Sequence, residues 1–420
     1  MPGPIIIFDK SALECLNVDE ALWLDNFFLT NITPLFFVET LADLQKQVAR
    51  GRTPEQVVGN IALKTPQMES SPNMSHSALC LSNLLGGHIE MCGFPVLGGG
   101  IQTITGDKRG IIFNHPPEFQ ALQRWQRGEF LQVEHEFARQ WRRNLSGLDL
   151  GQICRQFKHF LKEAKPKLIA ETKAFVDQMM HKHGGRYSFL KVACELLGVP
   201  QHLRPKVIER WKLMGAPHFS DFAPYAAHVL SVDLFFYLSL AADLISPNRP
   251  SNKIDIAYLY YLPFCMVFTS NDNLHKKAAP LFLRKDQVFI PGVDLKADLK
   301  KLDDHYSLLP QDVKETGIIK FAQYPPLEGD YLVTALWDRF LPRWRKNATE
   351  PVQMSEEAEK RLVEHLRRLQ ADARIDNSSK RVTTQEADHL IIKRRVPARK
   401  GKWRLLPPEV EKSAECEDGL

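Results

Sequence analysis

The sequence predicts an α/β protein in which a short parallel sheet is interrupted by a long, mostly helical insertion. Three observations lead to this prediction. Apolar runs at 5–8 and 33–38 are each followed by a helical pattern, which is the opening of an α/β unit. The segment 116–245 is helical in pattern throughout. After a break at 246–250, the alternation of helices and strands resumes over 254–290.

The first part of the expected sheet lies near the start of the chain. Residues 5–8 form an uninterrupted apolar run that ends at Asp9, as is typical of a buried parallel strand. Helical spacing follows over 11–28. The second apolar run, 33–38, predicts the next strand, and Glu39 opens a helix with one apolar face.

The middle of the chain has a different character. Residues 65–115 are rich in Gly, Ser, Asn and Pro and predict a small β-hairpin at 93–113 that turns at 106–109. The most apolar long stretch, 223–245, has the length of a membrane helix, but Asp233 and two further polar residues interrupt it. We therefore expect a buried core helix and no membrane contact. A buried Asp233 would need a partner.

The α/β pattern predicts, in order, a helix at 254–262, a strand at 266–269, a helix at 274–283 and a strand at 287–290. A charged helix is expected at 354–374, with glutamates in its first turn and arginines near its end. The predicted units are the first part of the α/β domain at 1–50, the insertion at 51–250, the second part at 251–295, a mixed or helical extension at 296–375 and a flexible basic tail at 376–420.

The composition is that of an ordinary soluble globular protein, with 44% hydrophobic and 25% charged residues. The formal net charge of +5 permits a polyanionic partner without requiring one. The seven cysteines include no C-x2-C pair, which argues against a disulfide framework or a structural zinc site and favours a reducing cytoplasm. The start lacks the basic and long apolar regions of a signal peptide. We therefore expect a cytoplasmic protein.

Four acidic residues fall at the ends of predicted elements: Asp9, Glu39, Asp255 and Asp272. In an open parallel sheet, the carboxyl ends of the strands face one common crevice. Carboxylates gathered there repel one another unless a cation neutralises them, and an all-oxygen ligand set favours Mg²⁺ or Mn²⁺. Such a site can activate water for attack on a phosphodiester. Asp43, one turn after Glu39, is either an additional ligand or an exposed helix acid.

Each acid also has a purely structural interpretation. Asp9 and Asp255 could be N-terminal caps of helices. Asp272 could be a turn residue, and Glu39 could be a solvated residue in the first turn of a helix. The occurrence of all four at element ends, in order along the chain, favours metal binding.

The motifs around these acids resemble those of PIN-domain nucleases. They are Phe8-Asp9-Lys10-Ser11, Phe37-Val38-Glu39-Thr40-Leu41, Asp255-Ile256-Ala257-Tyr258-Leu259 and Phe268-Thr269-Ser270-Asn271-Asp272, and they occur in the family's order. The resemblance implies a PIN-like α/β/α fold, a divalent metal and endonuclease activity on single strands, most often RNA. It also implies metal ligands at Asp9, Glu39, Asp255 and Asp272, with polar support from Ser11, Ser270 and Asn271. The long insertion departs from the compact form of the family.

The basic tail is a second candidate site for nucleic acid. Its cations and its one aromatic residue suit a phosphate backbone and a stacked base. The residues are Lys393, Arg394, Arg395, Arg399, Lys400, Lys402, Trp403 and Arg404. The alternative is a solvated tail, or a segment that packs on an acidic neighbour.

The main hypothesis is a bacterial, cytoplasmic PIN-like endonuclease that uses Mg²⁺ or Mn²⁺ to cleave single-stranded RNA, or DNA. The alternative is a PIN-like protein without catalysis that serves as a binding or scaffold module. Under either hypothesis the insertion at 51–250 is a candidate surface for a protein partner or for a second copy of the chain.

Overall fold

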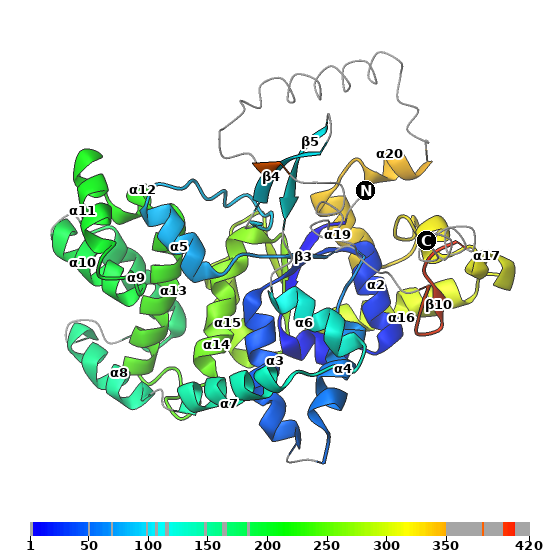
Figure 1. Cartoon of the computed structure of the whole chain (residues 1–420), viewed down its shortest axis with the longest axis horizontal. Coiled ribbons are helices and arrows are strands. Elements are labelled where there is room, and N and C mark those ends of the chain that lie inside the picture. Colours follow the sequence, from blue (N-terminus) through cyan, green and yellow to red (C-terminus); the bar gives the residue numbers. More distant parts are fainter. Residues whose placement is uncertain are drawn as a thin grey trace.

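Five parallel strands form the main sheet, in the order β3-β2-β1-β6-β7. The structure is a computed structural model that describes residues 3–48, 51–68, 70–97, 100–105, 108–113, 117–146, 149–161, 166–182, 185–349, 380–381 and 398–407. The strands are β1 (Ile5–Phe8), β2 (Leu29–Ile32), β3 (Ser70–Pro72), β6 (Val267–Ser270) and β7 (Val288–Pro291). β1 lies at the centre, between β2 and β6, so segments far apart in the sequence are side by side (Figure 1). The predicted class, an α/β protein with a parallel sheet and many helices, is confirmed.

Helices cover both faces of this sheet (Figure 1). They include α1 (Lys10–Cys15), α2 (Val18–Phe27), α3 (Pro34–Val48), α4 (Pro54–Lys64), α14 (Asn252–Ala257), the 3-10 segment η2 (Tyr258–Phe264), α15 (Asn273–Ala278), the 3-10 turn η3 (Ala279–Leu281) and α16 (Gly292–Ser307). The side chains of β1 alternate between the two faces, as the pleat of a strand requires. Ile5 and Ile7 join one hydrophobic cluster, and Ile6 and Phe8 join the other. Both faces of the central strand are therefore buried.

The second strand is not where the sequence predicts it. Residues 33–38 were expected to form a strand, but β2 ends at Ile32 and the apolar run belongs to the start of α3. Proline suits the first turn of a helix, where its missing N–H has no intrahelical partner, and Pro34 is the first residue of α3. The apolar run is buried in either geometry, so apolarity alone did not decide between strand and helix. As a result, Glu39 lies within α3 and does not open it.

The insertion was expected at 51–250, but β3 within that range is a strand of the main sheet; the chain between β3 and α14 is mostly helical, as the sequence predicts. Its helices are α5 (His76–Leu84), α6 (Pro117–Gln126), α7 (Gln132–Ser146), α8 (Leu150–Phe157), the 3-10 segment η1 (Lys158–Leu161), α9 (Ile169–Met180), α10 (Arg186–Leu196), α11 (Arg204–Leu213), α12 (Phe219–Phe222) and α13 (Pro224–Ala241). The expected hairpin is present as β4 (Gly100–Thr105) and β5 (Lys108–Phe113), which pair antiparallel; β8 (Lys380–Arg381) pairs with β4.

The apolar helix α13 packs at the centre of the helical part. Among the described helices, it alone has the length and hydropathy of a membrane span, and 78% of that stretch is buried inside the protein. The sequence predicts such a core helix. Asp233 on α13 has the partner that its burial requires, because its carboxylate accepts hydrogen bonds from Lys253 Nζ and Tyr260 Oη. Asp233 therefore belongs to a structural ion pair and not to the group of acids at the sheet.

The remaining described segments follow α16. They are α17 (Gln311–Glu315), α18 (Ile318–Phe321), α19 (Leu332–Phe340), α20 (Trp344–Thr349) and the two short strands β9 (Arg399–Lys400) and β10 (Trp403–Arg404). The charged helix expected at 354–374 lies outside the described residues.

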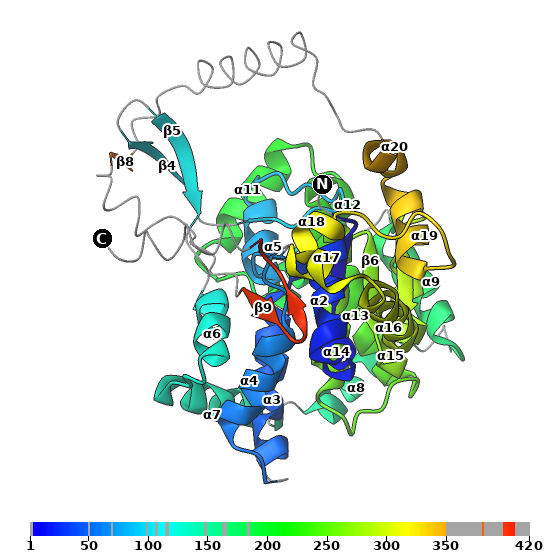
Figure 2. The same ribbon diagram turned by 90° about the vertical axis from the view of Figure 1, so that its right-hand side faces the viewer.

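The end of the chain differs from the expected flexible tail over 398–407. These residues form an antiparallel hairpin, β9–β10, which Figure 2 shows in red beside α2. Trp403 is only 2% exposed and packs edge-on against Trp23, with ring centres 5.0 Å apart. Its Nε1 donates to Asp303 Oδ1 at 2.7 Å, and Lys402 Nζ contacts Asp303 Oδ2 at 2.6 Å. This part of the tail packs on an acidic neighbour, which was the alternative interpretation.

The Trp403 hydrogen bond gives a testable measure of this docking. Trp403→Phe is expected to lower the free energy of unfolding by about 1–2 kcal/mol, because the buried Asp303 carboxylate loses a donor. Urea denaturation followed by circular dichroism measures the change. Arg399→Gln is the matched control, since its ion pair with Glu315 is exposed and is expected to contribute less than about 1 kcal/mol. Unchanged stability of Trp403→Phe would contradict the docked arrangement.

Candidate functional site

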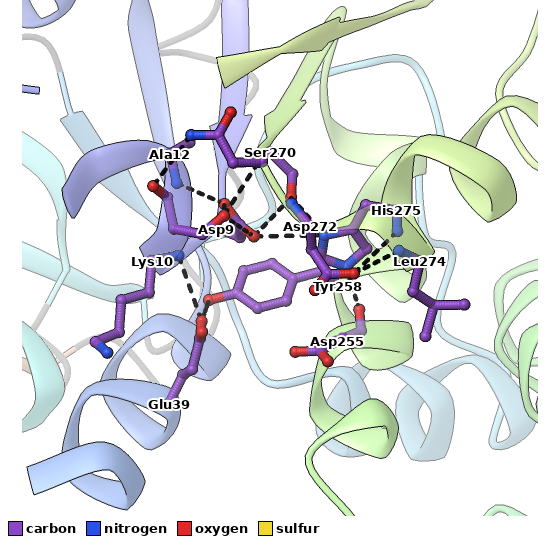
Figure 3. Close-up of polar contacts among 12 residues, drawn as sticks. Asp9, Lys10, Ala12, Glu39, Asp255, Tyr258, Ser270, Asp272, Leu274 and His275 are labelled. Atoms are coloured by element: carbon purple, nitrogen blue, oxygen red, sulfur yellow. Dashed lines mark hydrogen bonds and ion pairs between the residues drawn. The ribbon is translucent and has the colours of Figure 1, made fainter. Parts of the chain in front are cut away.

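The candidate site lies at the carboxyl ends of β1 and β6. The chain continues from β1 to β2 and β3 on one side of the sheet, while β6 and β7 extend it on the other, so this pair is the topological switch point. Open α/β sheets bind ligands in the crevice at such points. Asp9 directly follows β1, and Ser270 is the last residue of β6. Figure 3 shows their side chains directed toward each other.

Asp9 is the buried acid of the site and is only 3% exposed. It caps α1, because its Oδ1 accepts a hydrogen bond from the Ala12 N–H at 2.9 Å. Ser11 Oγ lies 2.9 and 2.8 Å from its two oxygens, and Ser270 Oγ donates to Oδ2 at 2.6 Å. His275 Nδ1 lies 3.4 Å from Oδ2. Both carboxylate oxygens therefore already contact protein donors.

His275, on α15, is buried against Asp9. Its Nδ1 also lies 2.7 Å from Ser270 Oγ, and its Nε2 lies 2.5 Å from the main-chain oxygen of Asp255. Burial alone would lower the pKa of His275, but the hydrogen bond and charge of Asp9, together with Asp255, raise it to about 9. His275 is therefore a cation at neutral pH.

The contact between Asp9 and His275 has the opposite effect on the pKa of Asp9. Burial alone would raise the pKa of Asp9, but the hydrogen bond and positive charge of His275, with two weaker hydrogen bonds, outweigh burial and lower that pKa. The pair is thus ionised, Asp9 as the anion and His275 as the cation.

Glu39 reaches the site from α3 and is partly exposed. Its Oε2 accepts hydrogen bonds from Tyr258 Oη at 2.8 Å and from the Lys10 N–H at 3.3 Å. Burial and then the charge of Asp9 raise the pKa of Glu39 to about 8, and Asp255 acts in the same direction. Lys10 and the Tyr258 hydrogen bond offset only part of this increase. Burial and the neighbouring charges of Asp9 and Asp255 therefore disfavour the ionised form of Glu39.

The other two predicted acids take different positions. Asp255 lies in α14, and its charge contributes to the raised pKa values of Glu39 and His275. Figure 3 shows its carboxylate on the side of Glu39. Asp272 is the N-terminal cap of α15, where its Oδ1 accepts from the Leu274 N–H at 2.6 Å. The structure thus brings Asp9, Glu39 and Asp255 together and gives Asp272 a capping role close by.

The predicted polar support residues join β1 to β6. Ser11 Oγ accepts from the Asn271 N–H at 3.0 Å, and Asn271 Nδ2 donates to the Ser11 main-chain oxygen at 3.4 Å. The Asn271 amide packs against Gly292, where a Cβ atom would lie 2.8 Å from Asn271 Oδ1. Glycine at 292 therefore allows this close approach. Asp43 lies in α3, and its side chain is outside the described part of the structure.

The tail residues proposed for nucleic-acid binding are not part of this group. Lys393, Arg394 and Arg395 lie outside the described residues. Trp403 is buried in the core, and the Nζ of buried Lys400 donates to the Thr65 main-chain oxygen at 3.2 Å. The remaining ones form ion pairs: Arg399 and Arg404 with Glu315, and Lys402 with Asp303. None of these contacts is with the acid cluster.

Two residues of the site were not predicted from the sequence, His275 and Tyr258. Each lies three positions after a predicted acid, Asp272 and Asp255 respectively. In a helix, residues three apart lie on the same face. That spacing, applied to polar residues next to each acid, would have found both.

The acids of this cluster have the donor chemistry that a divalent cation requires. The nearby acids supply only oxygen donors, as Mg²⁺ and Mn²⁺ prefer. Asp9 and Asp255, whose charges contribute to the raised pKa of Glu39, carry negative charge that a bound cation would offset. The side-chain positions do not yet form a cage: among the described residues, no three Asp, Glu, His or Cys side chains are arranged to hold a metal ion. Binding would require movement of the partly exposed Glu39 and Asp255.

Comparisons with known proteins add no assignment: no family model, no curated protein and no solved structure matches this chain.

The raised pKa of Glu39 predicts a dependence of stability on pH. The folded protein retains the Glu39 proton between pH 4.5 and about 8, where the unfolded chain has lost it, so stability falls as pH rises through this window. Glu39→Gln cannot ionise and still offers an acceptor to Tyr258. We expect equal stability of variant and wild type near pH 5. At pH 9 the variant should be more stable by roughly 1–2 kcal/mol, a value reduced for the partial exposure of Glu39.

Urea denaturation at pH 5 and pH 9, without divalent metal, measures this difference. Glu14→Gln is a matched control, because Glu14 is exposed and pairs with Lys10 at 3.1 Å. A Glu39→Gln variant that is less stable than wild type at pH 9 would show that other groups stabilise the ionised Glu39 carboxylate in the folded protein.

Proposed function

We propose that this protein is a PIN-like, metal-dependent endonuclease that cleaves single-stranded nucleic acid and prefers RNA to DNA. One observation carries the proposal: Asp9, Glu39 and Asp255 converge at the switch point of a parallel sheet, where burial and the charges of Asp9 and Asp255 raise the pKa of Glu39 to about 8. Three carboxyl groups at this position suit a divalent cation that contacts a phosphodiester.

The chain topology also supports the PIN-like assignment. The sheet order β3-β2-β1-β6-β7 brings the motif after β1 next to the motif after β6, although the long insertion separates them in the sequence. The acidic residues that resemble the family's ligands come from the end of β1, from α3 and from α14. The resemblance implies these three acids, together with Asp272, as metal ligands.

In this proposal, Mg²⁺ or Mn²⁺ is held by Asp9, Glu39 and Asp255, with Asp272 close by. When bound, the cation supplies electrophilic stabilisation of the phosphate and lowers the pKa of water. Ser11 and Ser270 fix the orientation of the Asp9 carboxylate.

Glu39 would act as a metal ligand in its ionised form. Without metal its pKa is about 8, and a bound cation would favour the carboxylate and lower that pKa. The hydroxyl of Tyr258 and the N–H of Lys10 hold its Oε2 in place.

The test is cleavage of labelled single-stranded RNA and DNA of mixed sequence by the full chain. Reactions contain Mn²⁺, Mg²⁺ or EDTA. We expect cleavage that requires the divalent metal and that is faster on RNA than on DNA. Cleavage in EDTA would contradict the metal requirement, and preference for DNA would correct the substrate.

A second candidate function has its own observation. Both oxygens of Asp9 accept hydrogen bonds from the protein, and His275 already supplies a positive charge to the cluster. This arrangement also suits a PIN-like protein without catalysis that binds nucleic acid or a protein partner. It predicts binding that is the same in Mn²⁺ and EDTA, with no cleavage of either polymer.

A further inference from the structure

The helical part of the protein contains a large cavity that the proposed nuclease site does not use. Its volume is about 750 Å³, which is in the range of ligand-binding pockets. It lies among α8, η1, α9, α10, α11, α12 and α13, and its described walls are mainly apolar. Six aromatic side chains line it: Phe157, Phe160, Phe175, Phe189, Trp211 and Phe219.

Part of this apolar lining is open to solvent. Phe160 is 42% exposed and Val192 is 51% exposed. Contiguous apolar surface of this kind is unfavourable in water and marks binding sites. An apolar occupant that covered these side chains would remove that cost.

The wall of the cavity also contains a cation, Arg186. Its guanidinium donates to the Ala216 main-chain oxygen at 3.1 Å and lies 3.1 Å from His218 Nε2. Its buried Nε has no hydrogen-bond partner among the described residues. Arg186 as a whole is only partly buried and lines the cavity, so its positive charge is suited to an anionic group of a ligand. The described lining contains no Asp or Glu that could neutralise this charge.

A second feature directs positive potential to the same place. Arg186 is the first residue of α10, which has 11 residues, and Gly185 before it provides no side-chain cap. The first N–H groups of a helix lack intrahelical partners and carry partial positive charge. Gly185, Arg186 and Ser188 all line the cavity. The helix start and the guanidinium thus favour an anion at one end of an otherwise apolar space.

We propose that this cavity binds an apolar monocarboxylate, that is, a long-chain fatty acid. Its hydrocarbon chain would lie among the aromatic side chains, and its carboxylate would accept hydrogen bonds from Arg186 and from the N-terminus of α10. This inference is independent of the nuclease proposal, because it uses different residues in a different part of the fold.

The test uses the full chain and the fluorescent probe 1-anilinonaphthalene-8-sulfonate, which has an apolar ring system and one negative charge. Dodecanoate is expected to displace the probe. Hexanoate, with six fewer methylene groups to bury, should bind at least about 100-fold more weakly. Dodecan-1-ol should bind at least about 10-fold more weakly than dodecanoate, because it lacks the charge-assisted hydrogen bonds. Dodecyl phosphate that binds more tightly than dodecanoate would overturn the carboxylate assignment.

Variants locate the site. Arg186→Gln is expected to weaken dodecanoate binding at least about 10-fold and to leave dodecan-1-ol binding unchanged. Arg155→Gln is the matched control, because Arg155 is 70% exposed and does not line the cavity. Equal binding of dodecanoate and dodecan-1-ol by the wild-type protein would overturn the proposal, and so would an absence of dodecanoate binding. This comparison needs no variant, so it remains decisive if Arg186→Gln fails to fold.

Discussion

Asp9→Asn is expected to reduce metal-dependent cleavage of single-stranded RNA at least about 100-fold, if the proposed function is correct. Asp9 is the acid that is most firmly positioned, with hydrogen bonds from Ser11, Ser270 and the Ala12 N–H. The amide removes the negative charge that a cation needs and keeps the size of the side chain. Initial rates in Mn²⁺ measure the effect, and circular dichroism checks the fold.

Two further variants serve as a control and as a test of the role of Asp272. Asp286→Asn is the control, since Asp286 is exposed and pairs with Arg284. Asp272→Asn separates capping from metal binding, because asparagine caps a helix about as well as aspartate does. A large loss of activity in Asp272→Asn, with unchanged stability, would assign Asp272 to the metal site. Unchanged cleavage by Asp9→Asn would contradict the nuclease proposal.

His275→Ala is expected to lower the free energy of unfolding by about 3–5 kcal/mol at pH 6, because it leaves the buried Asp9 carboxylate without its cation. The two side chains are only 1% and 4% exposed, so water replaces little of the lost interaction. The sign of the pH effect follows from the pKa of His275, which folding raises from 6.5 to about 9. Stabilisation by its charge is complete below pH 6.5 and is lost as pH rises through 9.

The decrease in unfolding free energy caused by His275→Ala should therefore be smaller at pH 10 than at pH 6. Urea denaturation at both values measures it, and Lys276→Ala is the control, because Lys276 is the exposed neighbour on the same helix. An equal cost at both pH values would mean that His275 acts by packing and not by charge. If the nuclease proposal holds, Mn²⁺ should recover part of the lost stability, since a cation would again face Asp9.

The alternation of strands and helices was predictable because the buried strands are short, apolar and followed by polar residues. The runs 5–8 and 266–269 both correspond to strands, and the acids after them do lie together. The run 33–38 was placed in the wrong element, since a buried helix and a buried strand are equally apolar over six residues. Apolar periodicity identified the helical segments of the insertion, because it shows which face of a helix is buried. It does not show which element packs against that face, so the arrangement of these helices could not be predicted.

The missing parts of the site share one cause. His275 and Tyr258 act through contacts with Asp9 and Glu39, which lie far away in the sequence, and only their spacing of three residues from Asp272 and Asp255 marks them locally. Trp403 and Lys400 looked like a nucleic-acid contact because a basic, aromatic segment has the same composition whether it is free or docked. Long-range contacts, such as those with Trp23 and with the main chain at Thr65, distinguish the two.

The position of β6 next to β1 has a consequence for synthesis of the chain. Ser270, which donates to Asp9, lies 261 residues after it. At translation rates of about 5–20 residues per second, roughly 13–50 s pass between the appearance of these two residues. During that time one edge of β1 has no neighbouring strand, and Asp9 has no histidine beside it. A nascent chain that stops within the insertion therefore carries an exposed strand edge prone to wrong pairing, so we infer that truncated products of this gene aggregate and contain no assembled site.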